Sequence, residues 1–100
     1  MLRAAGLELL ERNFRCRGGE IDLVMNERGT LVFVEVRQRR SPAFGDAAES
    51  VTRAKQRKLL TAAAVYVARH PSWQPRPARF DVVCIDGESI TWLDNAIEAP

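Results

Sequence analysis

Charged side chains alternate with apolar ones in two neighbouring segments of this chain. Glu20 and Asp22 lie in the first segment, and Glu35 and Arg37 lie in the second. Carboxylates without nitrogen or sulfur ligands nearby suit a hard cation such as Mg²⁺, or Mn²⁺, which keeps several waters and often meets substrate phosphates. Beside a guanidinium, such an ion would support metal-assisted hydrolysis of a phosphodiester bond. The alternative is a plain ion pair between Arg37 and one of the acids.

These side chains form one site only if the strands that carry them are paired and in the right register. Residues 20–25 and 30–37 are rich in β-branched and other apolar residues and are predicted to be strands, joined by a turn at 26–29. If this turn is a four-residue loop, the three acids and Arg37 share one face of the hairpin. A loop one residue shorter or longer would place Asp22 and Glu35 on opposite faces.

The four-residue loop predicts a particular set of facing residues. The pairs are Met25 with Thr30, Val24 with Leu31, Asp22 with Phe33, and Glu20 with Glu35. The face opposite to the acids is then wholly apolar, and it consists of Ile21, Leu23, Met25, Val32, Val34 and Val36. We therefore expect this apolar face to pack on a helix.

The remaining pattern predicts an α/β domain with the element order β-β-β-α-β-β. Further strands are expected at 7–15, 79–85 and 89–93, and residues 47–69 have high helix propensity. Ser50 or Thr52 is expected to cap the main run of this helix. A helix between the third and fourth strands favours a right-handed crossover, which gives a mixed central sheet with the long helix on one face.

Length and composition limit the class of protein. A chain of 100 residues that is 46% hydrophobic and 28% charged is expected to form a single domain over residues 1–100. It has neither a run of about 18 uncharged apolar residues nor a signal peptide, so we expect a cytoplasmic protein without a membrane segment. Cys16 and Cys84 lack the spacing of a zinc site or of a disulfide framework, and both are expected to be reduced thiols.

Positive charge is concentrated in the middle of the chain. Residues 37–58 contain seven basic and two acidic residues, although the whole chain has a net charge of only +2. Such a region can contact a nucleic-acid backbone, and it can equally be a solvated surface. The candidate contacts are Arg39, Arg40, Arg53, Lys55, Arg57 and Lys58.

Asp81 is an acid within an otherwise apolar predicted strand at 79–85. A buried carboxylate needs a cation or hydrogen-bond donors. We expect it to pair with Arg79 or Arg76, and a wider polar network remains the alternative.

Several motifs together resemble those of the YraN family of bacterial proteins. They are NFR at 13–15, GEIDLV at 19–24, LVFVEVR at 31–37 and RFDVV at 79–83, with Arg39 and Lys55. The resemblance spans residues 7–97, nearly the whole chain. It implies a restriction-endonuclease-like fold of the PD-(D/E)XK type and a magnesium-dependent nuclease that acts on nucleic acid, with DNA as the expected substrate.

The resemblance also assigns roles to individual residues. Asp22 is the first metal-binding acid, Glu35 is the second, and Glu20 is an auxiliary acid. The motif's lysine falls on Arg37, which can stabilise charge but holds its proton too firmly to act as a base. This exchange leaves two alternatives to an enzyme, namely a nucleic-acid binder with a degenerate site and a protein-interaction module.

The fold of this family usually opens with a helix. Only residues 1–6 precede the first predicted strand, so the expected first helix is truncated. Apolar sheet surface would then be exposed, which invites a partner such as a second copy of the chain in a homodimer.

Overall fold

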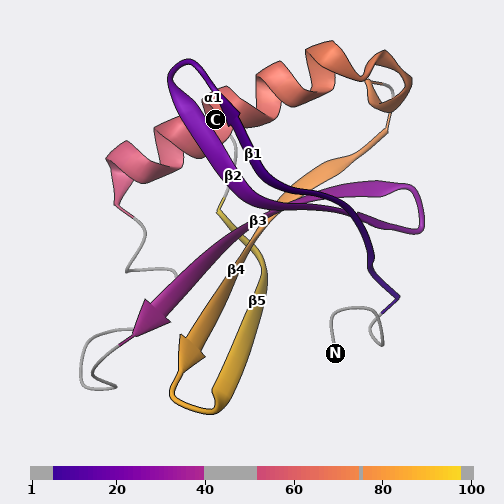
Figure 1. The fold of residues 1–100 in the computed structure, drawn as a ribbon. Helices are drawn as coiled ribbons and strands as arrows, with labels where there is room; N and C mark the ends of the chain where they lie inside the picture. The colour runs from indigo at the N-terminus through magenta and orange to yellow at the C-terminus, as the bar shows by residue number, and fades with distance from the viewer. Residues whose placement is uncertain (1–5, 40–51, 75, 98–100) are drawn as a thin grey trace.

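The chain folds into a five-stranded sheet with one long helix (Figure 1). The computed structural model describes residues 6–39, 52–74 and 76–97. The elements are β1 (Glu8–Cys16), β2 (Gly19–Glu27), β3 (Thr30–Arg39), α1 (Arg53–Arg69), the 3-10 helix η2 (Pro71–Trp73), β4 (Ala78–Asp86) and β5 (Ser89–Ile97). The predicted order is confirmed. The expected helical residues 47–51 lie outside the described residues, as do residues 1–5, which would belong to a truncated first helix.

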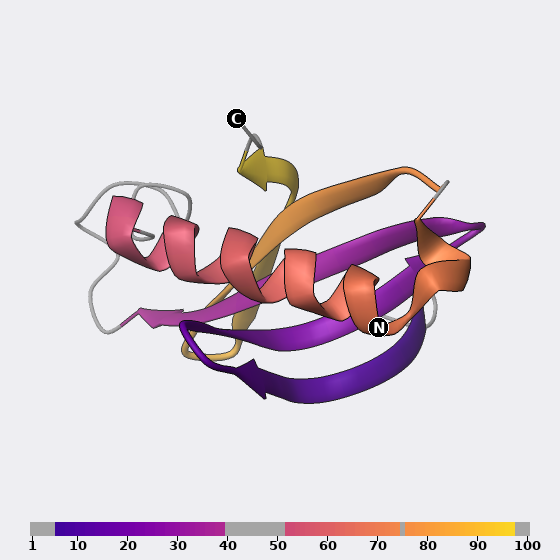
Figure 2. The same ribbon diagram turned by 90° about the horizontal axis from the view of Figure 1, so that it is seen from above.

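The sheet is mixed, with the strand order β1-β2-β3-β4-β5. Strands β3 and β4 are parallel, and the other neighbours are antiparallel. A parallel pair needs a crossover connection, and α1 provides it. Helix α1 lies across one face of the twisted sheet (Figure 2). This α/β architecture is the predicted one, and it is consistent with a restriction-endonuclease-like fold.

The β2–β3 register differs from the predicted one by two residues. Glu27, rather than Met25, lies opposite Thr30, so the loop contains only Arg28 and Gly29. Both loop residues have positive φ, 50° and 92°. A two-residue turn of this kind follows the right-handed twist of the strands better than the expected four-residue loop. Because the shift is an even number of residues, the side chains of residues 23–25 and 32–34 that were predicted to share a face of the hairpin still share it.

The prediction of which face packs on the helix was wrong for five of its six residues, and Ile21 alone belongs to the helix-side core. Val32 and Val34 point away from α1, whereas Phe33 lies on the helix side, with its ring centroid 6.0 Å from that of Tyr66. The helix-side face of β3 carries Glu35 and Arg37 beside Leu31 and Phe33, so its polarity led the prediction to the other, wholly apolar face. The helix-side core is Phe14, Ile21, Val24, Leu31, Phe33, Leu59, Ala62, Ala63, Tyr66, Phe80, Val82, Cys84 and Ile97. Large rings on the sheet thus face two small alanines on α1.

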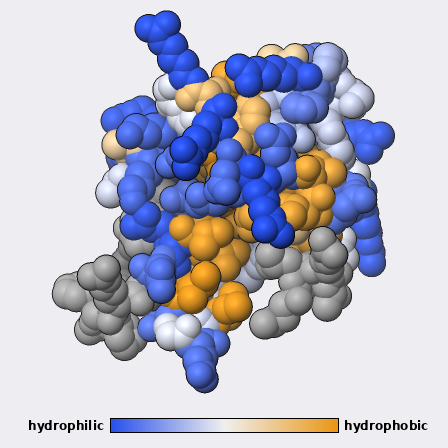
Figure 3. Space-filling model, viewed as in Figure 1, coloured by the Kyte–Doolittle hydropathy of each residue, from blue (hydrophilic) through white to orange (hydrophobic). Residues whose placement is uncertain are grey.

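A second apolar cluster lies on the face of the sheet away from α1. Its buried members are Leu7, Met25, Val32, Val34 and Val83, with Leu9, Leu23, Val36, Ile85 and Trp92 partly buried against them. In the view of Figure 3, hydrophobic side chains form a patch over the strands, surrounded by hydrophilic residues. Among residues 6–39, 52–74 and 76–97, this face is less completely covered than the helix side.

Asp81 on β4 is completely buried and has several hydrogen-bond donors. Its carboxylate accepts hydrogen bonds from Arg79 Nε at 3.1 Å, from Trp92 Nε1 at 2.7 Å and from the backbone N–H of Asn95 at 2.8 Å. Arg79 Nη1 also donates to Glu27 Oε1 at 2.6 Å. The predicted pairing of Asp81 with Arg79 is confirmed, and it forms part of a network that joins β2, β4 and β5.

The helices and cysteines complete this description. Among the described residues, no helix is long and apolar enough to cross a membrane. Cys16 and Cys84 are both free thiols, and Cys84 is buried in the helix-side core.

Candidate functional site

A polar cavity of about 270 Å³ lies between the N-terminal half of α1 and strands β2 and β3. Its walls carry three acidic and three basic side chains, together with one valine: Glu20, Asp22, Glu35, Val36, Arg37, Lys55 and Lys58. All four predicted catalytic residues therefore line one cavity. With equal numbers of acids and bases, the cavity gains net positive charge as soon as a divalent cation enters.

Asp22 is held where β2 and β3 separate. The ladder between the two strands ends at Leu23 and Val34. One residue further along β2, Asp22 Oδ2 accepts a hydrogen bond from the backbone N–H of Val36 at 2.8 Å. The Asp22 carboxylate thus takes the place of a backbone carbonyl of β2 as the acceptor for the N–H of Val36. This bond fixes the direction of the Asp22 side chain and brings it level with Glu35.

Glu35 is the acid with the most perturbed environment in the cavity. Its side chain is only 16% exposed. Burial, followed by the nearby charge of Asp22, raises the pKa of Glu35 to about 7, although Arg37 and Lys55 oppose the shift. Protonated Glu35 also forms a hydrogen bond with Asp22. The two carboxyl groups are therefore close enough to repel each other, and a cation between them would relieve this repulsion.

Arg37 is next to this pair but only loosely engaged with it. Its Nη1 lies 3.8 Å from Glu35 Oε2, which is too long for a hydrogen bond. Arg37 Nε is buried and is the one such side-chain nitrogen or oxygen without a hydrogen-bond partner among the described residues. This Nε–H therefore lacks an acceptor within the described part of the chain, and an oxygen of a bound anion would supply one.

Helix α1 begins at the cavity. Thr52, one of the two expected caps, accepts a hydrogen bond from the backbone N–H of Lys55 at 3.2 Å. Lys55 and Lys58 are three residues apart, so they project from neighbouring positions of the helix, and both line the cavity. Arg53 and Arg57 are exposed and are not among the lining residues. The helical period directs them to another side of α1.

The helix is in direct contact with β2 at Gly19. A Cβ atom built on Gly19 would lie 2.1 Å from the carbonyl oxygen of Lys58 and 3.1 Å from the backbone nitrogen of Ala62. Only glycine allows the two backbones to approach so closely. Gly19 therefore holds Lys58 at the cavity, and the sequence analysis did not predict this role for it. The signal in the sequence was the double glycine at 18–19.

Glu20 lies at the rim, with a side chain that is 62% exposed. It forms an ion pair with Arg15, at 3.5 Å between Arg15 Nε and Glu20 Oε2. Arg15 was not predicted to lie near the site, and its position in the motif at 13–15 gave no direct indication of this contact. Of the other predicted contacts, Arg39 ends β3, but its side chain is not described, and Arg40 lies outside the described residues.

The donor set of the cavity limits the metal that could bind. The described residues contain no group of three or more His, Cys, Asp or Glu side chains arranged for a metal ion. Asp22 and Glu35 offer two carboxylates, which fits an ion such as Mg²⁺ that retains several waters. Burial and the charge of Asp22 raise the pKa of Glu35, and a cation bound between the two carboxyl groups would favour its ionised form.

Comparison with known proteins places the chain in a family. The model of "Uncharacterised protein family UPF0102" matches residues 1–85. The UPF0102 protein of Janthinobacterium sp. (strain Marseille) is 55% identical over 98 residues, which cover 98% of this chain and 78% of that protein. The UPF0102 protein HEAR0176 of Herminiimonas arsenicoxydans is 53% identical and likewise covers 98% of this chain and 77% of its own length. The chain therefore belongs to the UPF0102 family, in agreement with the YraN-like resemblance of its motifs.

Proposed function

We propose that this protein is a metal-dependent nuclease that hydrolyses phosphodiester bonds in nucleic acid, with DNA as the expected substrate. The observation that carries the proposal is the pair of repelling carboxyl groups, Asp22 and Glu35, in a cavity whose other walls are cationic. Two acids held together against their repulsion reduce stability unless a cation joins them. The cations around them suit the phosphate of a substrate.

The chain's own residues divide the work in this proposal. Asp22 and Glu35 would hold Mg²⁺ or Mn²⁺, with Glu35 in its ionised form. A divalent ion supplies Lewis-acid chemistry, since it neutralises charge on a phosphoryl oxygen and makes an attacking water more acidic. The unpaired Nε–H of Arg37 donates to a phosphate oxygen. Glu20 at the rim acts as the auxiliary acid.

The helix supplies ammonium groups that Arg37 cannot replace. Lys55 is close enough to Glu35 for its charge to lower the pKa of that acid. Lys58 lies beside it on the cavity wall. Both are placed to contact the phosphate backbone of a bound strand, whereas Arg53 and Arg57 project from another side of α1.

Cleavage of DNA in the presence of Mg²⁺ or Mn²⁺ tests the proposal. Branched, linear and single-stranded DNA are each incubated with the protein and the metal. We expect cleavage that Asp22→Asn reduces by at least about 100-fold, because a direct ligand of the metal is lost. Asp94→Asn is the matched control, because Asp94 is an exposed aspartate on β5 outside the cavity. Equal activity of the two variants would disprove the proposal.

A non-catalytic nucleic-acid binder is the second candidate, and the arginine at position 37 favours it. Arg37→Lys should raise cleavage if the arginine only weakens the motif. A protein that cuts nothing but binds DNA, with an affinity that falls steeply with salt, would be the binder. Lys55→Ala should then reduce the slope of log K against log salt by about 0.7–0.9. Absence of any affinity for DNA would leave a protein-interaction module.

A further inference from the structure

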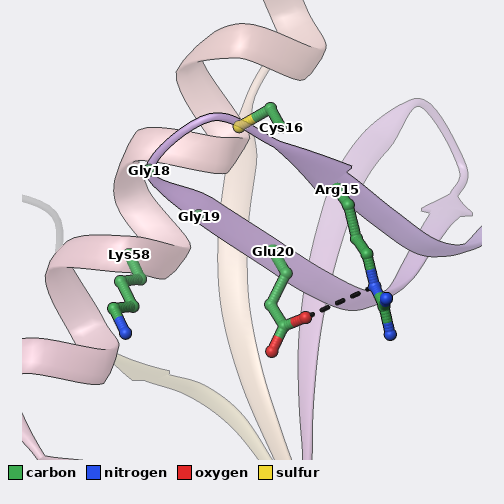
Figure 4. A pocket seen from close by; sticks show the side chains of 6 residues that line it. All are labelled: Arg15, Cys16, Gly18, Gly19, Glu20 and Lys58. Carbon is green, nitrogen blue, oxygen red and sulfur yellow. Dashed lines mark ion pairs between the residues drawn. The ribbon is translucent and has the colours of Figure 1, made fainter.

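A second cavity, of about 320 Å³, adjoins the first at the β1–β2 turn. It is lined by Arg15, Cys16, Gly18, Gly19, Glu20 and Lys58 (Figure 4). Two of these residues, Glu20 and Lys58, also line the carboxylate cavity. A ligand in the second cavity would therefore be an immediate neighbour of a ligand at Asp22 and Glu35.

The second cavity has two cationic side chains and one acid. Arg15 comes from β1 and Lys58 from α1, and in Figure 4 the carboxylate of Glu20 lies between them. The ion pair between Arg15 and Glu20 is 3.5 Å long, and the two side chains are 75% and 62% exposed. An exposed pair of this length contributes little to stability. Arg15 is therefore available to an anion that competes with Glu20.

The two glycines make this cavity a fixed structure. Gly18 has a φ of 91°, which favours glycine in the turn, and Gly19 is held against the backbone of α1. Neither adds a side chain to the wall. Because the contact with Gly19 involves the carbonyl oxygen of Lys58 itself, the spacing between the turn and this lysine is set by two backbones.

We propose that the second cavity binds a phosphate group through Arg15 and Lys58. Resting on the function proposed above, this phosphate is the one next to the scissile phosphate on the same nucleic-acid strand. A phosphate offers several oxygens, so it can accept from a guanidinium on one wall and an ammonium on the other at once. The site thus recognises the strand by its charge and not by its bases.

Titration of the metal-free protein with inorganic phosphate tests the cavity itself. The readout is the displacement of the backbone amide NMR signals of Gly18 and Gly19. Arg15→Gln should weaken phosphate binding about threefold to fivefold, since one exposed charge contact is lost. Glu20→Gln should strengthen it, because Arg15 loses its competing partner. Arg12→Gln is the matched control, since Arg12 is an exposed arginine of β1 outside both cavities.

These variants give results that can overturn the proposal. If Arg15→Gln binds phosphate as Arg12→Gln does, or if Glu20→Gln binds no more tightly than the unchanged protein, the cavity is not a phosphate site. If phosphate displaces neither glycine signal, the proposal also fails. A variant that unfolds would be recognised by loss of dispersion in the same spectra, and Arg15→Lys, which retains the charge, then takes its place with a smaller expected loss.

A single-stranded oligonucleotide tests the link to the strand. In the absence of metal, Arg15→Gln should reduce the slope of log K against log salt by about 0.7, the value for one phosphate contact on a single strand. Cleavage of DNA that is equal in Arg15→Gln and Arg12→Gln would leave the nuclease intact and disprove the neighbouring phosphate site. Phosphate binding that depends on Arg15, in a protein with no activity on DNA or RNA, would support the site and count against the nuclease.

Discussion

Two groups of acids and arginines lie on opposite faces of the same sheet. On the face away from α1, Asp81 is completely buried, yet it accepts hydrogen bonds from Arg79, Trp92 and the backbone of Asn95. On the helix side, Glu35 is partly exposed, but its nearest arginine is 3.8 Å away. The more deeply buried acid is thus the one whose hydrogen bonds are satisfied.

The difference separates groups that stabilise the fold from groups that suit a ligand. A buried polar network stabilises a structure when each of its members has a partner. Asp22 and Glu35 instead repel each other, and Arg37 Nε has no partner. Such incompletely satisfied groups are common at sites of binding and catalysis. Burial alone would indicate Asp81 as the functional acid, although its hydrogen bonds are satisfied within the fold.

Loss of Asp81 should have the largest effect on stability. Asp81→Ala leaves the Trp92 indole N–H and the Asn95 backbone N–H without an acceptor and leaves Arg79 with only Glu27. We expect the free energy of unfolding to fall by about 3–5 kcal/mol, as measured by urea denaturation. Asp94→Ala, at an exposed position on β5, should change it by less than about 0.5 kcal/mol. Similar values for the two variants would mean that the network does not stabilise the fold.

Loss of the charge of Glu35 should instead raise the free energy of unfolding. The pKa of about 7 in the folded protein lies above the usual value of 4.5, so the folded protein binds more protons and its stability falls as the pH rises from about 4.5 to 7. Glu35→Gln should remove this dependence. We expect it to raise the free energy of unfolding at pH 8 by about 1–2 kcal/mol, after allowance for solvent screening, and to have no effect near pH 4.

The control for Glu35 is Asp81, an acid whose hydrogen bonds are satisfied. Urea denaturation of Glu35→Gln and Asp81→Ala at pH 4, 6 and 8 compares the two groups directly. If Glu35→Gln destabilises the protein at pH 8, the carboxyl pair is not a source of repulsion, and the distinction between the two faces disappears.

A divalent cation should relieve the repulsion between Asp22 and Glu35 and so stabilise the protein. Mg²⁺ at about ten times its dissociation constant is expected to raise the free energy of unfolding by about 1.4 kcal/mol at pH 8. Asp22→Asn should abolish this stabilisation, which thermal denaturation with and without the metal would measure. Asp94→Asn should retain it. Absence of stabilisation by both Mg²⁺ and Mn²⁺ in the unchanged protein would contradict the metal site.

The smallest effect is expected at the solvent edge of the Asp81 network. A hydrogen bond from Arg79, together with the charge of Arg79, lowers the pKa of Glu27. Its contribution to stability is therefore present above the usual pKa of 4.5 and is lost as the pH falls below that range. Glu27→Gln should lower the melting temperature at pH 7 by less than Asp81→Ala does, and by less at pH 3 than at pH 7. A loss as large as that of Asp81→Ala would mean that the outer pair holds the network together.

The sequence predicted the order of elements and the shared cavity because both depend on periodicity. An error of two residues in the β2–β3 register did not matter to Asp22 and Glu35, since side chains alternate with a period of two. The face that packs on α1 was predicted wrongly, because Leu31 and Phe33 share their face of β3 with Glu35 and Arg37, whereas the opposite face is wholly apolar. The choice depends on ring packing between Phe33 and Tyr66, which no local pattern indicates.

Charge patterns predicted the helix residues only in part. Arg53, Lys55, Arg57 and Lys58 are a continuous basic run in the sequence, but the helical period separates them into two pairs on different sides. Only the pair Lys55 and Lys58 reaches the cavity. Arg15 reaches the neighbouring cavity through the pairing of β1 with β2, a long-range feature that spacing alone did not reveal.

Because Gly19 is in contact with the backbone of α1, the width of the neighbouring cavities and their charge can change independently. The distance between the walls of the two cavities depends on backbone atoms at Gly19 and Lys58, whereas their charge depends on side chains, of which α1 contributes Lys55 and Lys58. In the proposed phosphate site, substitutions on the surface of the helix would therefore alter the charge of the cavities without widening or narrowing them. Such substitutions would change the affinity for phosphate in small steps, whereas a methyl group at Gly19 would push β2 and α1 apart.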